Sequence, residues 1–189
     1  MQFQGQQIEK LTDEELVQEI TKTNDTHLFG LLYDRYVSMV YNKCYGFVPS
    51  KEEAQDLTHD IFVKLFVKLK TYKGDSKFST WMYAFTYNHC INYLQREVKG
   101  TKNTFSVNEE IEEETMDEIA DEQIFELKAE KLNHALQQIS PNERALLLMK
   151  YQDDLSIKEI AILHNLGESA VKMRLNRAKN NLIKIYNTM

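Results

Sequence analysis

The sequence has few of the residues that turn-rich and cross-linked folds require. Six glycines and two prolines in 189 residues are too few for the many tight turns of a β-sandwich or β-barrel. The two cysteines, Cys44 and Cys90, cannot form a disulfide scaffold and suit a reducing compartment. No alternating strand pattern persists along the sequence. We therefore expect an all-α protein that works in the cytoplasm.

Export and membrane segments are also missing from the sequence. The first ten residues are rich in glutamine and lack the apolar run of a secretory signal. The longest stretch without Asp, Glu, Lys or Arg, residues 78–95, contains too many polar side chains for a lipid-facing helix. We expect no membrane insertion.

Acidic residues are concentrated in one stretch of the chain. The net charge is −6, but residues 109–126 contain ten acids and no base. Outside that stretch the chain has 23 basic and 19 acidic residues, so the rest of the chain has a net positive charge. A block of like charge between two apolar, patterned segments is typical of a linker. We expect two small helical domains, residues 10–98 and 127–187, joined by an acidic flexible linker, residues 99–126.

Helix starts are marked in both domains by a hydroxyl residue followed three positions later by a glutamate, which is the capping-box pattern. Four such pairs occur: Thr12/Glu15, Ser50/Glu53, Ser140/Glu143 and Ser156/Glu159. The last pair opens a short helix, and Asn165-Leu166-Gly167 then supplies a turn before a helix from about Glu168 to Tyr186. A short helix, a tight turn and a basic helix predict a helix-turn-helix unit.

The last helix of that unit has a core side and an outward side. With 100° per residue, Val171, Leu175 and Ala178 share one face. Cations and amides on the other side suit base edges and phosphates in a major groove. A solvated helix that closes a bundle is the alternative, and the preceding helix and turn favour DNA. The outward and flanking residues are Ser169, Lys172, Met173, Arg174, Asn176, Arg177 and Lys179.

The first domain is rich in rings, with twelve of the 20 aromatic residues between Tyr41 and Tyr93. Aromatic faces stack on the bases of single-stranded DNA, and a segment without carboxylates suits a surface beside phosphates. The polar loop from Tyr72 to Phe78 is the better candidate for holding a base. Core packing is the alternative for Trp81 and Phe85.

A third candidate surface lies on the helix over residues 50–70. Asp56, His59 and Asp60 share one side of it, near the rings of Phe62 and Phe66. Such a face suits a basic coiled coil, although a charged helix face is often simply solvated.

Catalytic and metal-binding patterns are missing. The five histidines and two cysteines show no CxxC or HExxH spacing, and Gly74 and Gly167 stand alone rather than in a phosphate-binding loop. We expect no enzyme activity, no metal and no cofactor.

Two sets of motifs occur in order along the sequence. They are Glu53-Ala54-Gln55-Asp56-Leu57-Thr58-His59-Asp60-Ile61-Phe62, Phe78-Ser79-Thr80-Trp81-Met82-Tyr83 with Asn88, Ile139-Ser140-Pro141 with Arg144, Leu155-Ser156-Ile157-Lys158-Glu159-Ile160-Ala161, and Val171-Lys172-x-Arg174-Leu175-x-Arg177-Ala178-Lys179. These motifs resemble those of a known family, the extracytoplasmic-function (ECF) sigma factors of bacterial RNA polymerase. Residues 28–96 resemble region two and residues 127–186 resemble region four.

The resemblance implies a factor that binds core RNA polymerase, recognises promoter DNA and helps to open it. It assigns the helix with Asp56, His59, Asp60, Phe62 and Phe66 to the polymerase clamp, and the helix-turn-helix to the minus-thirty-five element. For the minus-ten element the resemblance points to the loop and Asn88, and the cluster of rings adds Trp81 and Tyr87. The predicted minus-ten residues are therefore Tyr72, Lys73, Gly74, Asp75, Ser76, Lys77, Phe78, Trp81, Tyr87 and Asn88.

Two other functions stay open at this point. One is a stand-alone helix-turn-helix regulator, which needs no strand-opening surface. The other is a helical protein-interaction adaptor, which needs no basic stripe. An anti-sigma factor is a further partner to be tested.

Overall fold

The computed structural model describes residues 10–100, 119–125 and 127–189, with only the backbone for 97–100. Every regular element in these ranges is a helix, which confirms the all-α prediction. The chain divides into two compact units, Met1–Cys90 and Ile91–Met189, and the division falls within one helix. None of the described helices combines the length and the hydropathy that a membrane-spanning segment requires.

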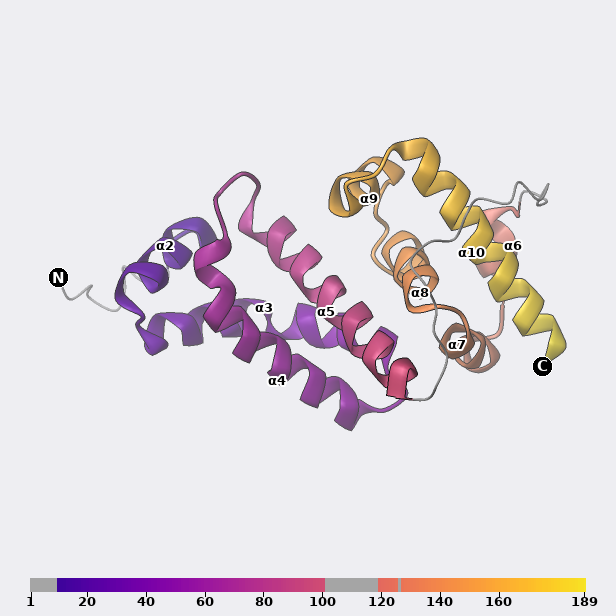
Figure 1. Ribbon diagram of the computed structural model, residues 1–189, viewed down its shortest axis with the longest axis horizontal. Coiled ribbons are helices and arrows are strands. Elements are labelled where there is room, and N and C mark those ends of the chain that lie inside the picture. The colour runs from indigo at the N-terminus through magenta and orange to yellow at the C-terminus, as the bar shows by residue number, and fades with distance from the viewer. Residues whose placement is uncertain (1–9, 101–118, 126) are drawn as a thin grey trace. The chain divides into compact units, whose positions relative to one another are not determined.

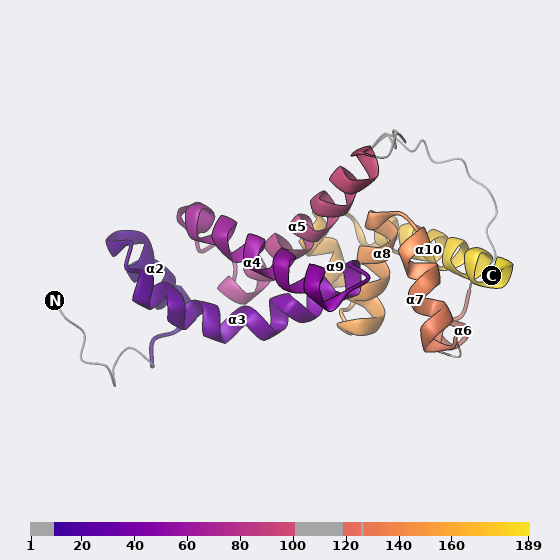
Figure 2. The same cartoon turned by 90° about the horizontal axis from the view of Figure 1, so that it is seen from below.

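Unit 1 is a bundle of four helices in which α3 packs along α4 and α2 packs against α3 (Figures 1 and 2). A short 3-10 turn, η1, and a loop then lead from α4 into α5. The elements are α2 (Asp13–Thr23), α3 (Thr26–Phe47), α4 (Lys51–Lys68), η1 (Leu69–Thr71) and α5 (Phe78–Gly100).

The helix starts of unit 1 follow the sequence signals. Thr12 forms the predicted capping box with Glu15, and the Ser50 side chain accepts from the backbone N–H of Glu53. Helix α5 begins at Phe78. There the Glu14 carboxylate accepts from the Phe78 backbone N–H at 2.8 Å. A side chain of α2 therefore holds the first turn of α5.

The core of unit 1 lies between α3, α4 and α5. Leu32 and Val40 of α3 and Ile61 and Leu65 of α4 are all fully buried, and these two helices pack against each other. Two thiols lie in the same core: Cys44 and Cys90 are both free, with their Sγ atoms 3.9 Å apart. They behave here as small apolar side chains.

In unit 2, α10 packs against α7, α8 and α9. The capping boxes at Ser140 and Ser156 are both present, and Asn165 ends α9 in the left-handed conformation with φ of 51°. The elements are α6 (Asp121–Phe125), α7 (Ala129–Gln138), α8 (Pro141–Leu147), the π-helical turn η2 (Leu148–Gln152), α9 (Ile157–His164) and α10 (Glu168–Thr188). Helices α9 and α10 form the predicted helix-turn-helix.

The predicted acidic linker, residues 99–126, is only partly within the structure. Residues 101–118 and 126 lie outside the described residues. Its last described part forms α6, in which Ile124 is buried. The domain limits 10–98 and 127–187 stay predictions.

Candidate nucleic-acid interfaces

The loop between η1 and α5 is exposed from Lys73 to Lys77. Its ends are joined by the Tyr72 hydroxyl, which donates to the Ser76 carbonyl at 2.5 Å. Gly74 has a φ of 81°, a conformation that glycine adopts without steric cost. Burial and the nearby carboxylates of Glu14 and Asp75 raise the pKa of Tyr72. The phenol therefore stays protonated and keeps its hydrogen bond to the loop.

A ladder of rings, which we call the α5 ladder, continues from this loop along α5. Its members are Tyr72, Trp81, Phe85 and His89, and all four side chains are half-buried. The Tyr72 and Trp81 centroids are 5.7 Å apart, and Trp81 stacks on Phe85 at 5.2 Å with 19° between the rings. The Phe85 and His89 centroids are 4.4 Å apart. The ladder gives unit 1 a partly exposed aromatic track.

Sequence reasoning predicted only part of this ladder. Tyr72 and Trp81 were expected at the site, whereas Phe85 was weighed against core packing and His89 was missed. The signal was available, because residues 81, 85 and 89 follow the i, i+4 spacing of one helix face.

Phe78 and Tyr87, both predicted to contact DNA, lie in the core. Phe78 is 0% exposed and Tyr87 is 1% exposed. The Phe78 ring meets Tyr36 edge-on at 5.4 Å, and Tyr87 meets Phe47 at 5.5 Å. Neither ring offers a face to a base in this structure. Asn88, by contrast, is exposed beside them on α5.

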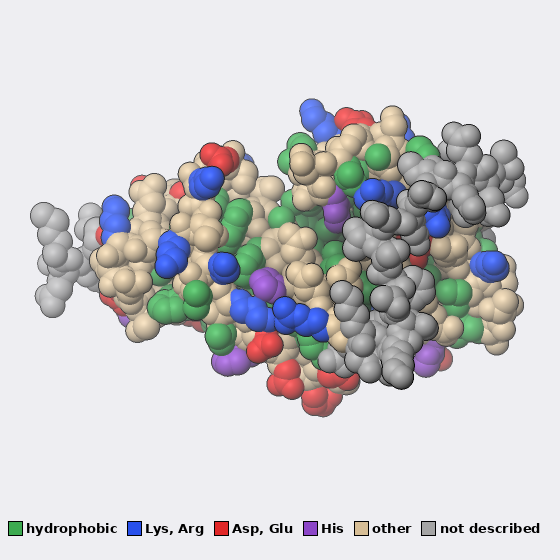
Figure 3. All heavy atoms as spheres, in the orientation of Figure 1, with side chains coloured by type: hydrophobic (Ala, Val, Ile, Leu, Met, Phe, Trp, Pro, Cys, Tyr) green, Lys and Arg blue, Asp and Glu red, His purple; other side chains and the backbone are tan. Residues whose placement is uncertain are grey.

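The charges around the site are uneven. Residues 78–95 contain no Asp, Glu, Lys or Arg. The visible surface along α5 shows hydrophobic and other uncharged side chains, with basic side chains beside them (Figure 3). The tip of the preceding loop carries both signs of charge, and acidic side chains gather where α4 begins (Figure 3). An anionic strand along α5 therefore meets little repulsion from the helix itself.

Helix α10 has the two sides that its sequence predicts. Val171, Leu175 and Ala178 are buried against the rest of unit 2. Four predicted contact residues in the first turns of the helix are exposed, and two more, further along, are half-buried. These are Ser169, Lys172, Met173 and Arg174 in the first group, and Asn176 and Arg177 in the second.

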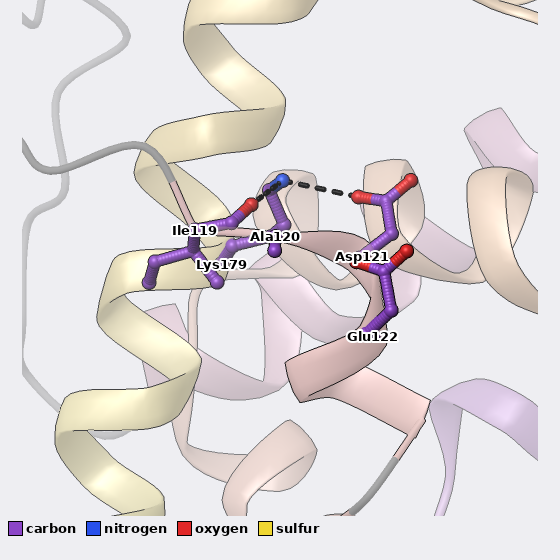
Figure 4. A pocket seen from close by; sticks show the side chains of 5 residues that line it. All are labelled: Ile119, Ala120, Asp121, Glu122 and Lys179. Carbon is purple, nitrogen blue, oxygen red and sulfur yellow. Dashed lines mark hydrogen bonds and ion pairs between the residues drawn. The ribbon is translucent and has the colours of Figure 1, made fainter.

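Lys179, the seventh predicted contact, is 8% exposed. Its ammonium group donates to the Ile119 carbonyl and pairs with the Asp121 carboxylate at 3.1 Å (Figure 4). The Asn176 side-chain oxygen accepts from the Ile119 backbone N–H at 3.3 Å. The segment that ends in α6 therefore holds two of the seven predicted contacts.

The predicted docking face on α4 contains both exposed and buried residues. Asp56, His59 and Asp60 are exposed, with Lys64 3.9 Å from Asp60. Phe62 is only 3% exposed, because its ring packs on Tyr33 at 4.5 Å. Phe66 is accessible, and so are two apolar neighbours that sequence reasoning missed, Val63 and Val67.

The described residues contain no group of three or more His, Cys, Asp or Glu side chains placed to hold a metal ion.

Comparison with known proteins identifies both units. The family model of sigma-70 region 2 matches residues 32–99, and that of sigma-70 region 4 matches residues 129–182. The ECF RNA polymerase sigma factor SigW of Bacillus subtilis is 27% identical over 176 residues, covering 86% of this chain and 91% of SigW. The ECF RNA polymerase sigma-E factor of Escherichia coli is 29% identical over 180 residues, covering 90% of this chain and 92% of that factor.

A solved structure agrees with the fold. The sigma factor RpoE of Bartonella quintana, in complex with the anti-sigma factor NepR, matches with a TM-score of 0.56 and 17% identity. The match covers 84% of this chain and 96% of that one. Region 2 therefore spans α3 to α5 and region 4 spans α7 to α10, whereas α6 lies outside both matched segments.

Proposed function

The chain belongs to the ECF group of the sigma-70 family, and we propose that its two units read two different forms of promoter DNA. Its role is promoter recognition in transcription initiation with core RNA polymerase, and sigma factors are not enzymes. We place this work in the cytoplasm, where bacterial RNA polymerase acts. The observation that carries the division of labour is the chemical contrast between the α5 ladder and the exposed face of α10.

Unit 1 is proposed to hold the opened minus-ten strand. A base turned out of the helix stacks on an aromatic face, and such stacking contributes about 1–3 kcal/mol per base. The α5 ladder offers partly exposed rings next to the polar loop at Lys73–Lys77. Asn88 is exposed and carries an amide that recognises base edges. Phe78 and Tyr87 then act from the core, by supporting the loop and the helix.

Unit 2 is proposed to read the minus-thirty-five duplex. Lys172 and Arg174 stand exposed in the first turns of α10, with Arg177 one turn further. Arg reads guanine with two hydrogen bonds in the major groove, and Lys binds guanine or phosphate. The capped helix α9 and the turn at Asn165 fix the angle at which α10 presents these groups.

The face of α4 is proposed to bind the polymerase. Asp56, His59 and Asp60 supply acceptors and charge, and Val63, Phe66 and Val67 supply exposed apolar area beside them. A charged rim around an apolar centre is typical of a protein interface. The match with a sigma factor solved in complex with its anti-sigma factor also supports an anti-sigma factor as a partner of this chain.

Run-off transcription tests the proposal. Purified core polymerase is assayed with and without this protein on a library of promoter fragments. We expect transcripts from a defined subset only when the protein is present. DNA binding without any polymerase-dependent transcript would favour a stand-alone regulator. Polymerase binding without promoter selection would favour an adaptor.

A further inference from the structure

The segment from Ile119 to Phe125 lies against α10 in unit 2, and we call it the clasp. Asp121 is its central contact. Its Oδ1 accepts from the Tyr151 hydroxyl at 2.5 Å and pairs with Lys179 at 3.1 Å. The Phe125 ring packs edge-on against Tyr151 at 5.6 Å, and Ile124 is buried. Figure 4 shows Lys179 reaching between Ile119 and Asp121.

The clasp binds α10 through groups that also suit DNA. An ammonium group binds a carboxylate and a phosphate in the same way, through charge-assisted hydrogen bonds. The Asn176 amide oxygen, which accepts from Ile119, is the atom that would accept from an adenine amino group. While the clasp is docked, Lys179 is 8% exposed and has no access to a phosphate.

Docking of the clasp depends on few contacts. Helix α6 has five residues, which is too short for a helix that is stable alone. Only Ile124 among these five is buried, and the Asp121 side chain is still 46% exposed. The hydrogen bond from Tyr151 and the charge of Lys179 lower the pKa of Asp121, so its carboxylate is ionised at neutral pH. Among the few described contacts of the clasp, Asp121 therefore supplies the negative charge.

From these contacts we propose that the clasp is an intramolecular competitor of DNA for α10. Its backbone and the Asp121 carboxylate occupy Asn176 and Lys179, and duplex DNA must displace it to reach them. The clasp precedes the segment matched by the region 4 family model, so it adds to the DNA-binding module rather than forming part of it. The inference rests on the proposed function of unit 2.

The test compares two variants that each remove one negative charge from the clasp. Asp121→Asn removes the charge that contacts Lys179, and Glu122→Gln removes an exposed charge next to it. Affinity of the full chain for a fluorescent 20-base-pair duplex of mixed sequence is measured by anisotropy over a range of salt concentrations. We expect Asp121→Asn to raise the affinity several-fold more than Glu122→Gln does. Its salt dependence should steepen by about 0.9, because Lys179 then meets a phosphate.

Two further variants test whether the gain in DNA affinity depends on Lys179 and on the hydrogen bond from Tyr151. Lys179→Gln added to Asp121→Asn should abolish the gain, and Tyr151→Phe should give a smaller gain in the same direction. Circular dichroism of each variant reports whether unit 2 still folds. Equal affinities for Asp121→Asn and Glu122→Gln would overturn the proposal, and so would weaker binding by Asp121→Asn.

Arg177→Ala distinguishes a failure of the clasp proposal from a failure of the proposed DNA binding by α10. If Arg177→Ala weakens duplex binding and Asp121→Asn has no effect, only the clasp is refuted. If Arg177→Ala has no effect either, the assignment of α10 to DNA is refuted with it.

Discussion

The two units present different chemistry on their candidate DNA surfaces. In unit 1 the surface is the α5 ladder, with the Asn88 amide beside it, on a helix whose first 18 residues contain no carboxylate. The loop before it carries both signs of charge. In unit 2 the surface is the outward side of α10, made of cations and amides. Unpaired bases expose flat faces, whereas a duplex exposes base edges and phosphates. The contrast therefore matches each unit to one state of the same promoter.

The units also differ in how closely the candidate site is joined to the core. In unit 1 the ladder touches the core directly, because Phe78 lies 5.7 Å from Trp81 and 5.3 Å from Tyr72, measured between ring centroids. In unit 2 the first turns of α10 carry the exposed residues that we propose to contact DNA on one side and buried core residues on the other. Function and stability should therefore be harder to separate in unit 1.

The largest expected effect tests this difference in unit 1. Phe78→Ala removes a fully buried ring, so the free energy of unfolding of unit 1 should fall by about 3–5 kcal/mol. Tyr72→Ala, at a half-buried position, should cost about 1 kcal/mol. Urea unfolding followed by the fluorescence of Trp81, the single tryptophan, measures both. Similar losses for the two variants would contradict the division between core and ladder.

The next effect concerns base reading by α10. Arg177→Ala should change base preference at one or two positions of the minus-thirty-five element, with a cost of about 1–3 kcal/mol for the lost contact. Lys184→Ala changes an exposed position two turns further along α10. It should weaken binding to all DNA sequences by the same factor. Promoter selection with holoenzyme from a random library compares them. An unchanged preference for Arg177→Ala would count against base reading.

A smaller effect is expected at the predicted docking face on α4. Replacing both Asp56 and Asp60 by Lys should weaken binding to core polymerase about tenfold. Charges at the rim of an interface mainly affect the rate at which the partners meet and the register in which they bind. The fold should be retained, since both side chains are exposed. Binding is measured by competition with an unlabelled wild-type chain. Equal affinity of the reversed variant and the wild type would remove this face from the interface.

The smallest effect is a pH dependence confined to unit 2. Burial, and then the charge of Arg174, lower the pKa of His164 from its usual 6.5. Below pH 6.5 the unfolded chain thus binds a proton that the folded unit does not. The contribution of neutral His164 to the free energy of unfolding is therefore fully present above pH 6.5. It is lost on acidification, by at most about 1.4 kcal/mol per pH unit. Urea midpoints at pH 7 and pH 5 should differ less for His164→Gln than for the wild type.

Much of this architecture could be predicted from the sequence. Three of the four predicted capping boxes are complete, at Thr12, Ser140 and Ser156, because capping depends on residues three positions apart. The core side of α10 followed from helical spacing alone. Both predictions rest on local geometry, which the sequence carries directly.

The contacts that sequence reasoning missed are tertiary. Helical spacing places Phe62, Phe78 and Tyr87 on a face but does not say which neighbour covers it, and all three are buried. Lys179 was assigned to DNA because its own helix leaves it at the edge of the outward side. Its burial depends on Ile119 and Asp121, about 60 residues earlier in an acidic stretch with weak apolar patterning.

Transcription from a pre-opened promoter tests the division of labour most directly. Holoenzymes with Tyr72→Ala and with Arg177→Ala are compared on a selected promoter, first as a full duplex and then with the minus-ten region mismatched into a bubble. If unit 1 holds the opened strand and unit 2 reads the duplex, the bubble should restore much of the activity lost by Tyr72→Ala and little of that lost by Arg177→Ala. Equal rescue of the two variants, or rescue of Arg177→Ala alone, would contradict the account.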